Sequence, residues 1–433
     1  MNYRRSLLNL LLILYIPVAS AKGRYEVHEW GTFTSLIGSN GYTVDGMYHE
    51  DEPLPDFVHG FGELFSTVPR PNPILNPTPV LPVDPTDPCQ RPTKIPCDFI
   101  QANSITQKME TPVIYFYTNF EQEVEVDVRY PQGAVTETFP GPAYTFPTSQ
   151  SAPYLQNGHT IFRVKLNSMD DRSLDHLVPQ VAADNIYSHA RRPNSSIVQA
   201  GAETEKFIFY RGVGNFTPEA YFSSHNGDFS ISAYSGKTIP AAFLIDVAPM
   251  GQARMLELGP IPQGTSANVP ADVIAHLQAH ETRADDIISD RQAMRQSLIN
   301  ALTGAGLFED EAIAMIDTWE HGYLQVPGLR LLYILPRTET DKILPLTITP
   351  RPYTLERVFV GRVEVMLDTY EQALVDQVLA TRYYFDPAVL GRFAEPKLRR
   401  AADVYRARPI HDEEGNALFI HLIDRARLLN LQL

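Results

Sequence analysis

Residues 123–130 alternate strictly between polar and apolar side chains, and few folds accommodate that pattern. The segment reads Glu-Val-Glu-Val-Asp-Val-Arg-Tyr, which has the period of a strand with one wet face and one buried face. Many short strands separated by turn residues predict a β-rich α+β fold with an antiparallel β-sandwich core over residues 98–268. The other runs of this kind cover residues 160–166, 206–210, 229–234, 241–247 and 255–258.

A helical and α+β region begins at residue 269 and extends to residue 433. Pro270 stands where a helix begins, and 3.6-residue patterning follows it. The late strands of this region either complete the first sheet or build a second α+β module, and the sequence leaves both open. The expected elements are a helix at 271–303, either continuous or with a break, a helix at 309–321, strands at 329–335 and 357–366, and helices at 369–380 and 387–406.

Residues 1–21 have the pattern of a secretory signal peptide. Two arginines precede an apolar run over residues 7–18, and Ala19-Ser20-Ala21 supplies a small-x-small cleavage site. An uncleaved N-terminal anchor is the alternative, although the run is short for a membrane span. No later stretch has the ~18 consecutive apolar residues that a span needs. The sequence therefore predicts a periplasmic or secreted protein with no membrane span after cleavage.

The chain is acidic, with 51 Asp and Glu against 36 Lys and Arg among 433 residues and a formal net charge of −15. Proteins that bind nucleic acid neutralise its phosphates with clustered lysine and arginine. The charge balance therefore argues against nucleic acid as a partner. A small molecule, a glycan or a protein partner remains open.

Residues 69–97 form a proline-rich loop, in which ten residues are proline. Because proline removes backbone donors and fixes φ, neither a helix nor a central strand is expected there. The two cysteines of the chain, Cys89 and Cys97, lie in this loop. In an oxidising compartment they are expected to form one disulfide. The loop separates an N-terminal motif region, residues 22–68, from the β-rich stretch.

Residues 25–34 are the most distinctive stretch and read Tyr-Glu-Val-His-Glu-Trp-Gly-Thr-Phe-Thr. In a flat strand His28 and Glu29 point to opposite faces, so they serve one site only if Gly31 marks a bulge that re-aims the chain. His28 suits the role of a catalytic base or a metal ligand. A histidine two residues from Trp30 is equally compatible with ordinary packing.

Two further histidines lie close to His28 in the sequence. His49 is followed by Glu-Asp-Glu, and His59 is followed by Gly-Phe-Gly. The three histidines and the nearby carboxylates have the composition of a catalytic zinc or non-haem iron site. The spacing matches no compact metal motif, and isolated histidines are common in acidic surface loops. A divalent metal at these three histidines is therefore one hypothesis, and the cofactor is otherwise unknown.

Three charged residues accompany strongly apolar strands. Residues 108–112 open a strand in which Lys108 and Glu110 share one face, and these two form either a catalytic pair with tuned pKa values or a surface ion pair of small worth. Arg330 lies within Pro-Gly-Leu-Arg-Leu-Leu-Tyr. It either clamps a carboxylate or phosphate of a substrate or neutralises an internal glutamate.

Three of these stretches resemble a family of large exported bacterial proteins that share an N-terminal His-Glu-Trp-Gly-Thr-Phe-Thr motif. They are residues 28–34, 108–112 and 327–333, and residues 357–362 extend the resemblance. The resemblance implies a bacterial source and a periplasmic or secreted location. It implies no reaction, cofactor or catalytic residue, because no activity is established for the family.

Two functions are consistent with the sequence. The first is an exported hydrolase-like enzyme, in which His28 and Glu29, with Lys108, Glu110 and Arg330, supply acid–base chemistry where the N-terminal motif meets the β-rich core. The second is a non-catalytic β-sandwich that binds a glycan, a peptide or a protein partner through aromatic side chains, of which 21 are tyrosine. The sequence contains no Gly-x-Ser-x-Gly elbow, Walker loop or dinucleotide-binding glycine loop. An enzyme predicts that the motif converges on a deep pocket, whereas a binding protein predicts that the motif is buried in packing.

Overall fold

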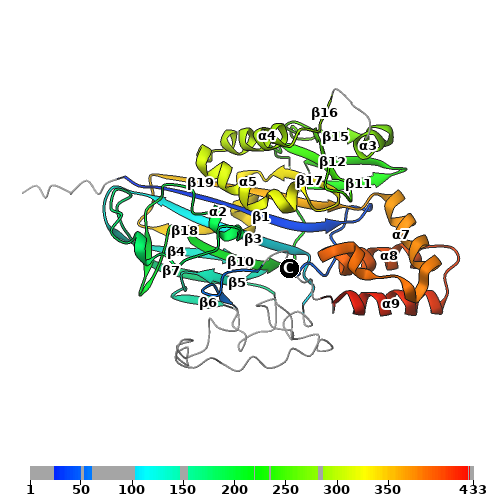
Figure 1. Cartoon of the computed structure of the whole chain (residues 1–433), viewed down its shortest axis with the longest axis horizontal. Coiled ribbons are helices and arrows are strands. Elements are labelled where there is room, and N and C mark those ends of the chain that lie inside the picture. Colours follow the sequence, from blue (N-terminus) through cyan, green and yellow to red (C-terminus); the bar gives the residue numbers. More distant parts are fainter. Residues whose placement is uncertain are drawn as a thin grey trace, which may run out of the picture.

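The computed structural model describes residues 24–49, 53–60, 103–146, 155–218, 220–233, 236–280, 286–427 and 429. Strands and helices in this part form the β-rich α+β fold that the sequence predicts (Figure 1). The predicted signal peptide and the proline-rich loop with its two cysteines lie outside the described residues. Within the described part, no helix is both long enough and apolar enough to cross a membrane.

A ten-stranded sheet forms the centre of the fold. Its central strand β1 (Glu26–Ile37) is parallel to β19 (Thr354–Val365) and antiparallel to β3 (Gln107–Tyr117), so the sheet is mixed. The late strands therefore complete the first sheet and do not form a second module. In order across the sheet, the strands are β16 (Ile287–Ile288), β14 (Ala253–Glu257), β13 (Ala242–Val247), β17 (Gly328–Ile334), β19, β1, β3, β10 (Ile208–Gly214), β5 (Gly133–Phe139) and β2 (His59–Gly60).

Two smaller sheets pack on one face of this central sheet. Val126 and Phe162 of the larger of the two share a core with Ile114 and Phe116 of β3, which makes the predicted sandwich. The strand over residues 123–130 alternates between buried and outward side chains, as its pattern predicts. The six-stranded sheet contains β18 (Leu346–Thr349), β4 (Gln122–Tyr130), β7 (Gly158–Leu166), β8 (Val198–Ala200), β9 (Glu203–Glu205) and β6 (Tyr144–Phe146). The three-stranded sheet contains β11 (Ala220–His225), β12 (Asp228–Ala233) and β15 (Ser266–Val269).

Helices cover the opposite face of the central sheet. Trp30 and Val113 of the sheet pack there against Leu298 and Trp319 of two helices. The helix expected over residues 271–303, either continuous or with a break, has the break: it is two helices, with β16 between them. The helices on this side are α2 (Ile186–His189), α4 (Arg291–Gly304) and α5 (Glu309–Leu324). Two other helices, α3 (Ala271–Gln278) and α6 (Arg337–Ile343), contribute to the core on the sandwich side, and η1 (Asp175–Leu177) is a short connecting element.

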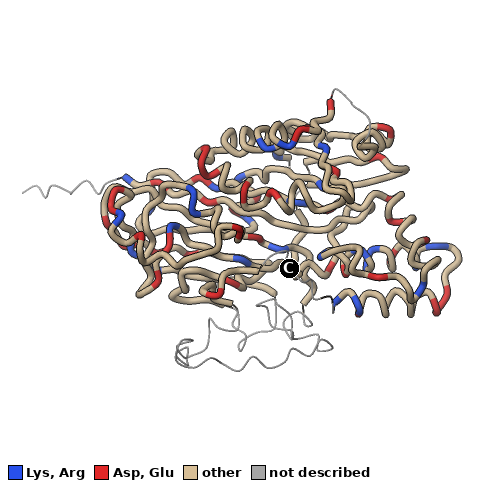
Figure 2. Tube along the Cα trace, in the orientation of Figure 1, with Lys and Arg blue, Asp and Glu red and all other residues tan. Residues whose placement is uncertain are grey.

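The last helices of the chain lie beside one end of the central sheet, at the right of Figure 1. Their core contains Leu374, Leu398 and Leu422, together with Leu36 from the end of β1. The helix expected at 387–406 begins as a 3₁₀ segment and is interrupted at Gly391 (φ 62°). The elements are α7 (Asp368–Thr381), η2 (Arg382–Tyr384), η3 (Pro387–Phe393), α8 (Ala394–Arg406) and α9 (Glu413–Arg427), the last of which was not predicted. Figure 2 shows that basic and acidic residues are interspersed along α8 and α9.

Candidate functional site

His28 faces the helical side of the central sheet and is held by α5. Its Nδ1 lies 2.8 Å from Oε2 of Glu311, which also accepts a hydrogen bond of 2.8 Å from the amide of Phe308. The hydroxyl of Tyr117 donates to the other carboxylate oxygen at 2.6 Å. Burial and then the Glu311 carboxylate raise the pKa of Tyr117. His28 is only 2% exposed, so its observed role is to tie β1 to the first turn of α5.

Glu29 points to the opposite, sandwich face of the sheet. Its carboxylate accepts hydrogen bonds from Nε of Arg357 and from the hydroxyl of Tyr210, and all three side chains are buried. Nη1 of the same arginine lies 2.8 Å from Asp341. Burial and then the Glu29 carboxylate raise the pKa of Tyr210. His28 and Glu29 are therefore separated by the sheet, as strand alternation predicts.

A β-bulge does lie at Gly31, but its extra residue is in β3. The pairs Trp30–Val113 and Thr32–Glu110 flank it, so Gly31 faces two residues of β3 and the alternation of β1 is undisturbed. One of the two, Thr111, has φ 47°, a left-handed conformation that a β-branched residue rarely adopts. The bulge consequently marks a strained point next to Glu110 without bringing His28 and Glu29 together.

Lys108 and Glu110 share the helical face of β3, as predicted, and both are buried. Nη1 of Arg392 lies 2.6 Å from Oε1 of Glu110, and Thr34 donates to Oε2 at 2.6 Å. Burial alone would raise the pKa of Glu110, but Arg392 outweighs it and lowers the pKa to about 2. Nζ of Lys108 lies 3.5 Å from the carbonyl oxygen of Tyr48. This part of the sheet is therefore densely charged but closed, and the surface ion pair expected of Lys108 and Glu110 is wrong because both side chains are buried.

Arg330 belongs to the same charged region. Of the two roles predicted for it, the contacts below correspond to the structural role, in which it neutralises an internal glutamate. Its Nη1 donates to the carbonyl oxygens of Gly322 and Tyr323, 2.9 Å away, near the end of α5. Its Nε lies 3.2 Å from Glu364, which Arg362 also contacts at 2.9 Å. We call these residues the charge cluster; it consists of Lys108, Glu110, Arg330, Arg362, Glu364 and Arg392.

The three histidines of the metal hypothesis pair with three different carboxylates. His28 contacts Glu311 on α5, as described above. Nε2 of His49 lies 4.0 Å from Glu395 on α8, and Nε2 of His59 lies 2.7 Å from Glu203 on β9. Among the described residues, no group of three or more His, Cys, Asp or Glu side chains is arranged to hold a metal ion.

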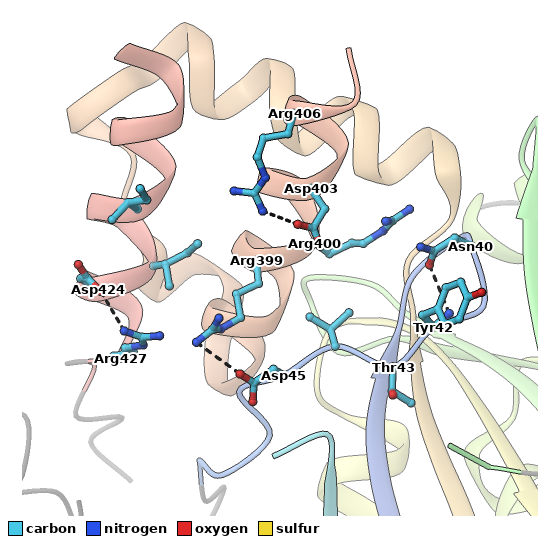
Figure 3. Close-up of a pocket in the computed structure, with 13 residues that line it drawn as sticks. Asn40, Tyr42, Thr43, Asp45, Arg399, Arg400, Asp403, Arg406, Asp424 and Arg427 are labelled. Carbon is cyan, nitrogen blue, oxygen red and sulfur yellow. Dashed lines mark hydrogen bonds and ion pairs between the residues drawn. The ribbon is translucent and has the colours of Figure 1, made fainter. Parts of the chain in front are cut away.

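An open groove lies next to the charge cluster, between α8, α9 and the loop of residues 40–45 that follows β1 (Figure 3). Its volume is about 370 Å³, within the range of small-molecule sites. Val44, Ile420 and Ile423 contribute apolar surface, and Asn40, Tyr42 and Thr43 contribute polar surface. The charged residues that line it are Arg399, Arg400, Arg406, Arg427, Asp45, Asp403 and Asp424.

A buried carboxylate orients two of these arginines. Oε1 of Glu395 accepts hydrogen bonds from Nε and Nη2 of Arg399 at 2.9 and 2.8 Å, and from Nε of Arg427 at 2.9 Å. The hydroxyl of Tyr48 donates to its other oxygen. Burial alone would raise the pKa of Glu395, but Arg399 outweighs it and the pKa is lowered. An ionised Glu395 therefore fixes both guanidinium groups where they line the groove, and Nη2 of Arg399 also lies 3.6 Å from Asp45.

The aspartates of the groove meet the arginines from the open side. Arg406 donates to Asp403, and each is more than half exposed, at 51% and 56%. Nη1 of Arg427 lies 3.1 Å from Asp424, as the dashed line in Figure 3 marks. Such exposed pairs are worth little, so an incoming ligand can exchange with them at small cost. The groove thus offers oriented donors beside acceptors in contact with solvent.

One pattern in the sequence indicates this groove. Arg399, Asp403 and Arg406 lie three or four residues apart within the helix expected at 387–406, so they share one face. The partners on α9 and in the 40–45 loop come from distant parts of the chain, and α9 was not predicted.

In comparisons with known proteins, no protein-family model and no curated protein matches this sequence. A function is therefore inferred from the geometry of the described residues. That geometry separates a motif engaged in internal contacts from a groove whose charged side chains reach solvent.

Proposed function

We propose that this protein is an exported binding protein that holds a small acidic ligand in the groove between α8, α9 and residues 40–45. The observation that carries the proposal is the pair of guanidinium groups, of Arg399 and Arg427, that the buried Glu395 orients at an open surface. Arginine recognises carboxylates and phosphates through paired donors, and a guanidinium already held in place loses less entropy on binding.

The groove supports binding better than the N-terminal motif supports catalysis. An acid–base pair must reach the same substrate, whereas His28 and Glu29 are buried on opposite faces and each contacts partners inside the fold. The charge cluster, which includes Glu110 and Arg392, is likewise buried. The hydrolase hypothesis drawn from the sequence stays a prediction, and the binding hypothesis has a described surface to act through.

Export is part of the proposal and rests on the pattern of residues 1–21. Purified protein from the producing cell should begin at Lys22, because the small-x-small site ends at Ala21. Mass spectrometry of the N-terminal peptide measures this. Protein that retains the first 21 residues would contradict export by cleavage.

Isothermal titration calorimetry tests the binding site. The mature protein is titrated with citrate, with the peptide Glu-Glu-Glu and with trigalacturonate, and at least one of these acids should bind. Arg427→Gln, which removes one of the two guanidinium groups that Glu395 orients, and Arg406→Gln should each weaken that binding by about tenfold or more, because a hydrogen bond to a charged group is worth roughly 1.5–3 kcal/mol.

The matched control is Arg163→Gln on β7, where an exposed arginine lies 2.8 Å from Glu125 in a comparable surface pair. This variant should bind like the unmodified protein. Absence of binding by all three acids, or equal binding by both Arg427→Gln and Arg406→Gln, would refute the groove as the ligand site.

A further inference from the structure

We infer that the ligand of this groove is an acidic saccharide, a sugar that carries a carboxylate. This inference rests on the proposed function and specifies its ligand class. It follows from the mixture of charges in the groove, the position of one exposed aromatic ring and the absence of a peptide-binding geometry among the residues that line it.

The mixture of charges fits a ligand with both acceptors and donors. Arginines alone would suit any polyanion, but Asp45, Asp403 and Asp424 line the same groove. They repel a densely charged polyphosphate or nucleic acid, and they accept hydrogen bonds from hydroxyl groups. A uronic acid presents one carboxylate and several hydroxyls on each ring, which matches the alternation of guanidinium and carboxylate along the groove.

Tyr42 supplies the apolar contact that a sugar ring needs. Its side chain is 71% exposed, and it lies at the end of the groove opposite Asp424 and Arg427 (Figure 3). An aromatic face packs against the C–H face of a sugar while polar groups bind the ring edge. A ligand that stacks at one end and pairs with arginine at the other spans the groove.

The backbone is built to present this ring. Gly41 has φ 81°, and a Cβ there would lie 2.3 Å from the carbonyl oxygen of Phe222, so only glycine fits the turn. The amide of Tyr42 donates to Oδ1 of Asn40 at 3.3 Å across the turn. The exposure of Tyr42 is therefore fixed by its neighbours in the loop.

A peptide fits the same surface less well. An extended peptide gains affinity by pairing with a sheet edge, but the groove is lined by a loop and by side chains of α8 and α9. A helical peptide needs a continuous apolar stripe, and the apolar lining here is limited to Val44, Ile420 and Ile423. An acidic peptide is therefore kept as the competing outcome of the test.

The experiment compares three ligands by isothermal titration calorimetry with the mature protein: trigalacturonate, its fully methyl-esterified form and the peptide Glu-Glu-Glu. We expect trigalacturonate to bind at least about tenfold more tightly than the other two. Tyr42→Ala should weaken its binding about three- to tenfold, since an aromatic contact is worth roughly 0.5–1.5 kcal/mol. Tyr384→Ala, which removes a tyrosine that is 95% exposed on η2, is the matched control and should change nothing.

The outcomes separate this inference from the proposed function. If Glu-Glu-Glu binds as tightly as trigalacturonate and Arg406→Gln weakens it, the acidic-ligand groove stands and the saccharide is wrong. If Tyr42→Ala binds trigalacturonate like the unmodified protein, the stacking contact is wrong. If the ester binds as well as the acid, or no acid binds, the proposed function fails and the inference fails with it.

Discussion

Glu110 is a full negative charge in a region that solvent does not reach. Arg392 and Thr34 hold its two oxygens, and Arg392 contributes from 282 residues further along the chain. Removing one partner of a buried ion pair leaves an uncompensated charge, which costs far more than loss of an exposed pair. Substitution of Glu110 therefore tests directly whether the charge cluster stabilises the fold.

Glu110→Gln should lower the free energy of unfolding by about 3 kcal/mol, because Arg392 is left buried without its carboxylate. Urea denaturation monitored by circular dichroism measures this. The control Glu125→Gln removes the carboxylate of an exposed pair with Arg163 and should cost less than about 1 kcal/mol. Equal effects of the two substitutions would show that the cluster contributes no more than a surface pair.

Stability should also depend on pH through Glu110. Its pKa is about 2 in the folded protein against an ordinary value of 4.5, so the unfolded chain binds the proton more readily. The stabilisation is complete above about pH 4.5 and is lost as the pH falls toward about 2. The difference in free energy of unfolding between the unmodified protein and Glu110→Gln should shrink over that interval. A difference that stays constant would contradict the lowered pKa.

Strand alternation was sufficient to predict which side chains share a face. It separated His28 from Glu29 and placed Lys108 beside Glu110, and the structure confirms both. It did not predict which residues these side chains contact. Glu311 follows His28 by 283 residues, and no local pattern identifies a contact at that separation.

At the scale of elements, contacts with β1 attach α5 to the central sheet. Glu311 lies in the first turn of the helix and is the shared acceptor for His28, Tyr117 and the amide of Phe308. The contact joins β1, β3 and α5 at one point. The conspicuous histidine of the sequence thus has an evident architectural role.

Glu311→Ala should destabilise the protein by about 3 kcal/mol, because it leaves buried donors without an acceptor. Glu309→Ala, at an exposed position in the same first turn, removes only a favourable charge near the helix N-terminus and should cost roughly 0.3–1 kcal/mol. Thermal unfolding of the two variants compares them. A Glu311→Ala protein as stable as Glu309→Ala would rule out the attachment role of His28.

Most strands and helices could be predicted from sequence period, and the exceptions have physical causes. Sequence period leaves open whether the 271–303 helix is broken and where, and in the structure Ile287–Ile288 pairs with β14 and separates α3 from α4. Gly391, with φ 62°, interrupts the segment before α8. Both departures depend on tertiary contacts or on a backbone conformation that residue period does not encode.

At the scale of the whole molecule, one sheet joins early and late segments of the chain. β1 lies between β3 and β19, and the pair Glu29–Arg357 connects residues 328 positions apart. The groove arises in the same way, since residues 40–45 leave the end of β1 and meet α8 and α9 there. Sequence period predicts the layers of this fold, but which segments meet at the groove is decided by long-range pairing.

The net negative charge of the whole chain does not describe the charge of the groove. The net charge of −15 belongs to the molecule as a whole, whereas four arginines and three aspartates line this one surface. Binding is set by the charges that face the ligand within about one Debye length, roughly 8 Å at physiological salt. An acidic protein can therefore present a local site for an acidic ligand.

A crystal structure of the mature protein with whichever of citrate, Glu-Glu-Glu or trigalacturonate binds most tightly tests the central claim most directly. The account predicts density for the ligand between α8, α9 and residues 40–45, with a carboxylate within hydrogen-bond distance of the Arg399, Arg406 or Arg427 guanidinium. An empty groove with the ligand bound elsewhere, at His28 or at the charge cluster, would contradict it.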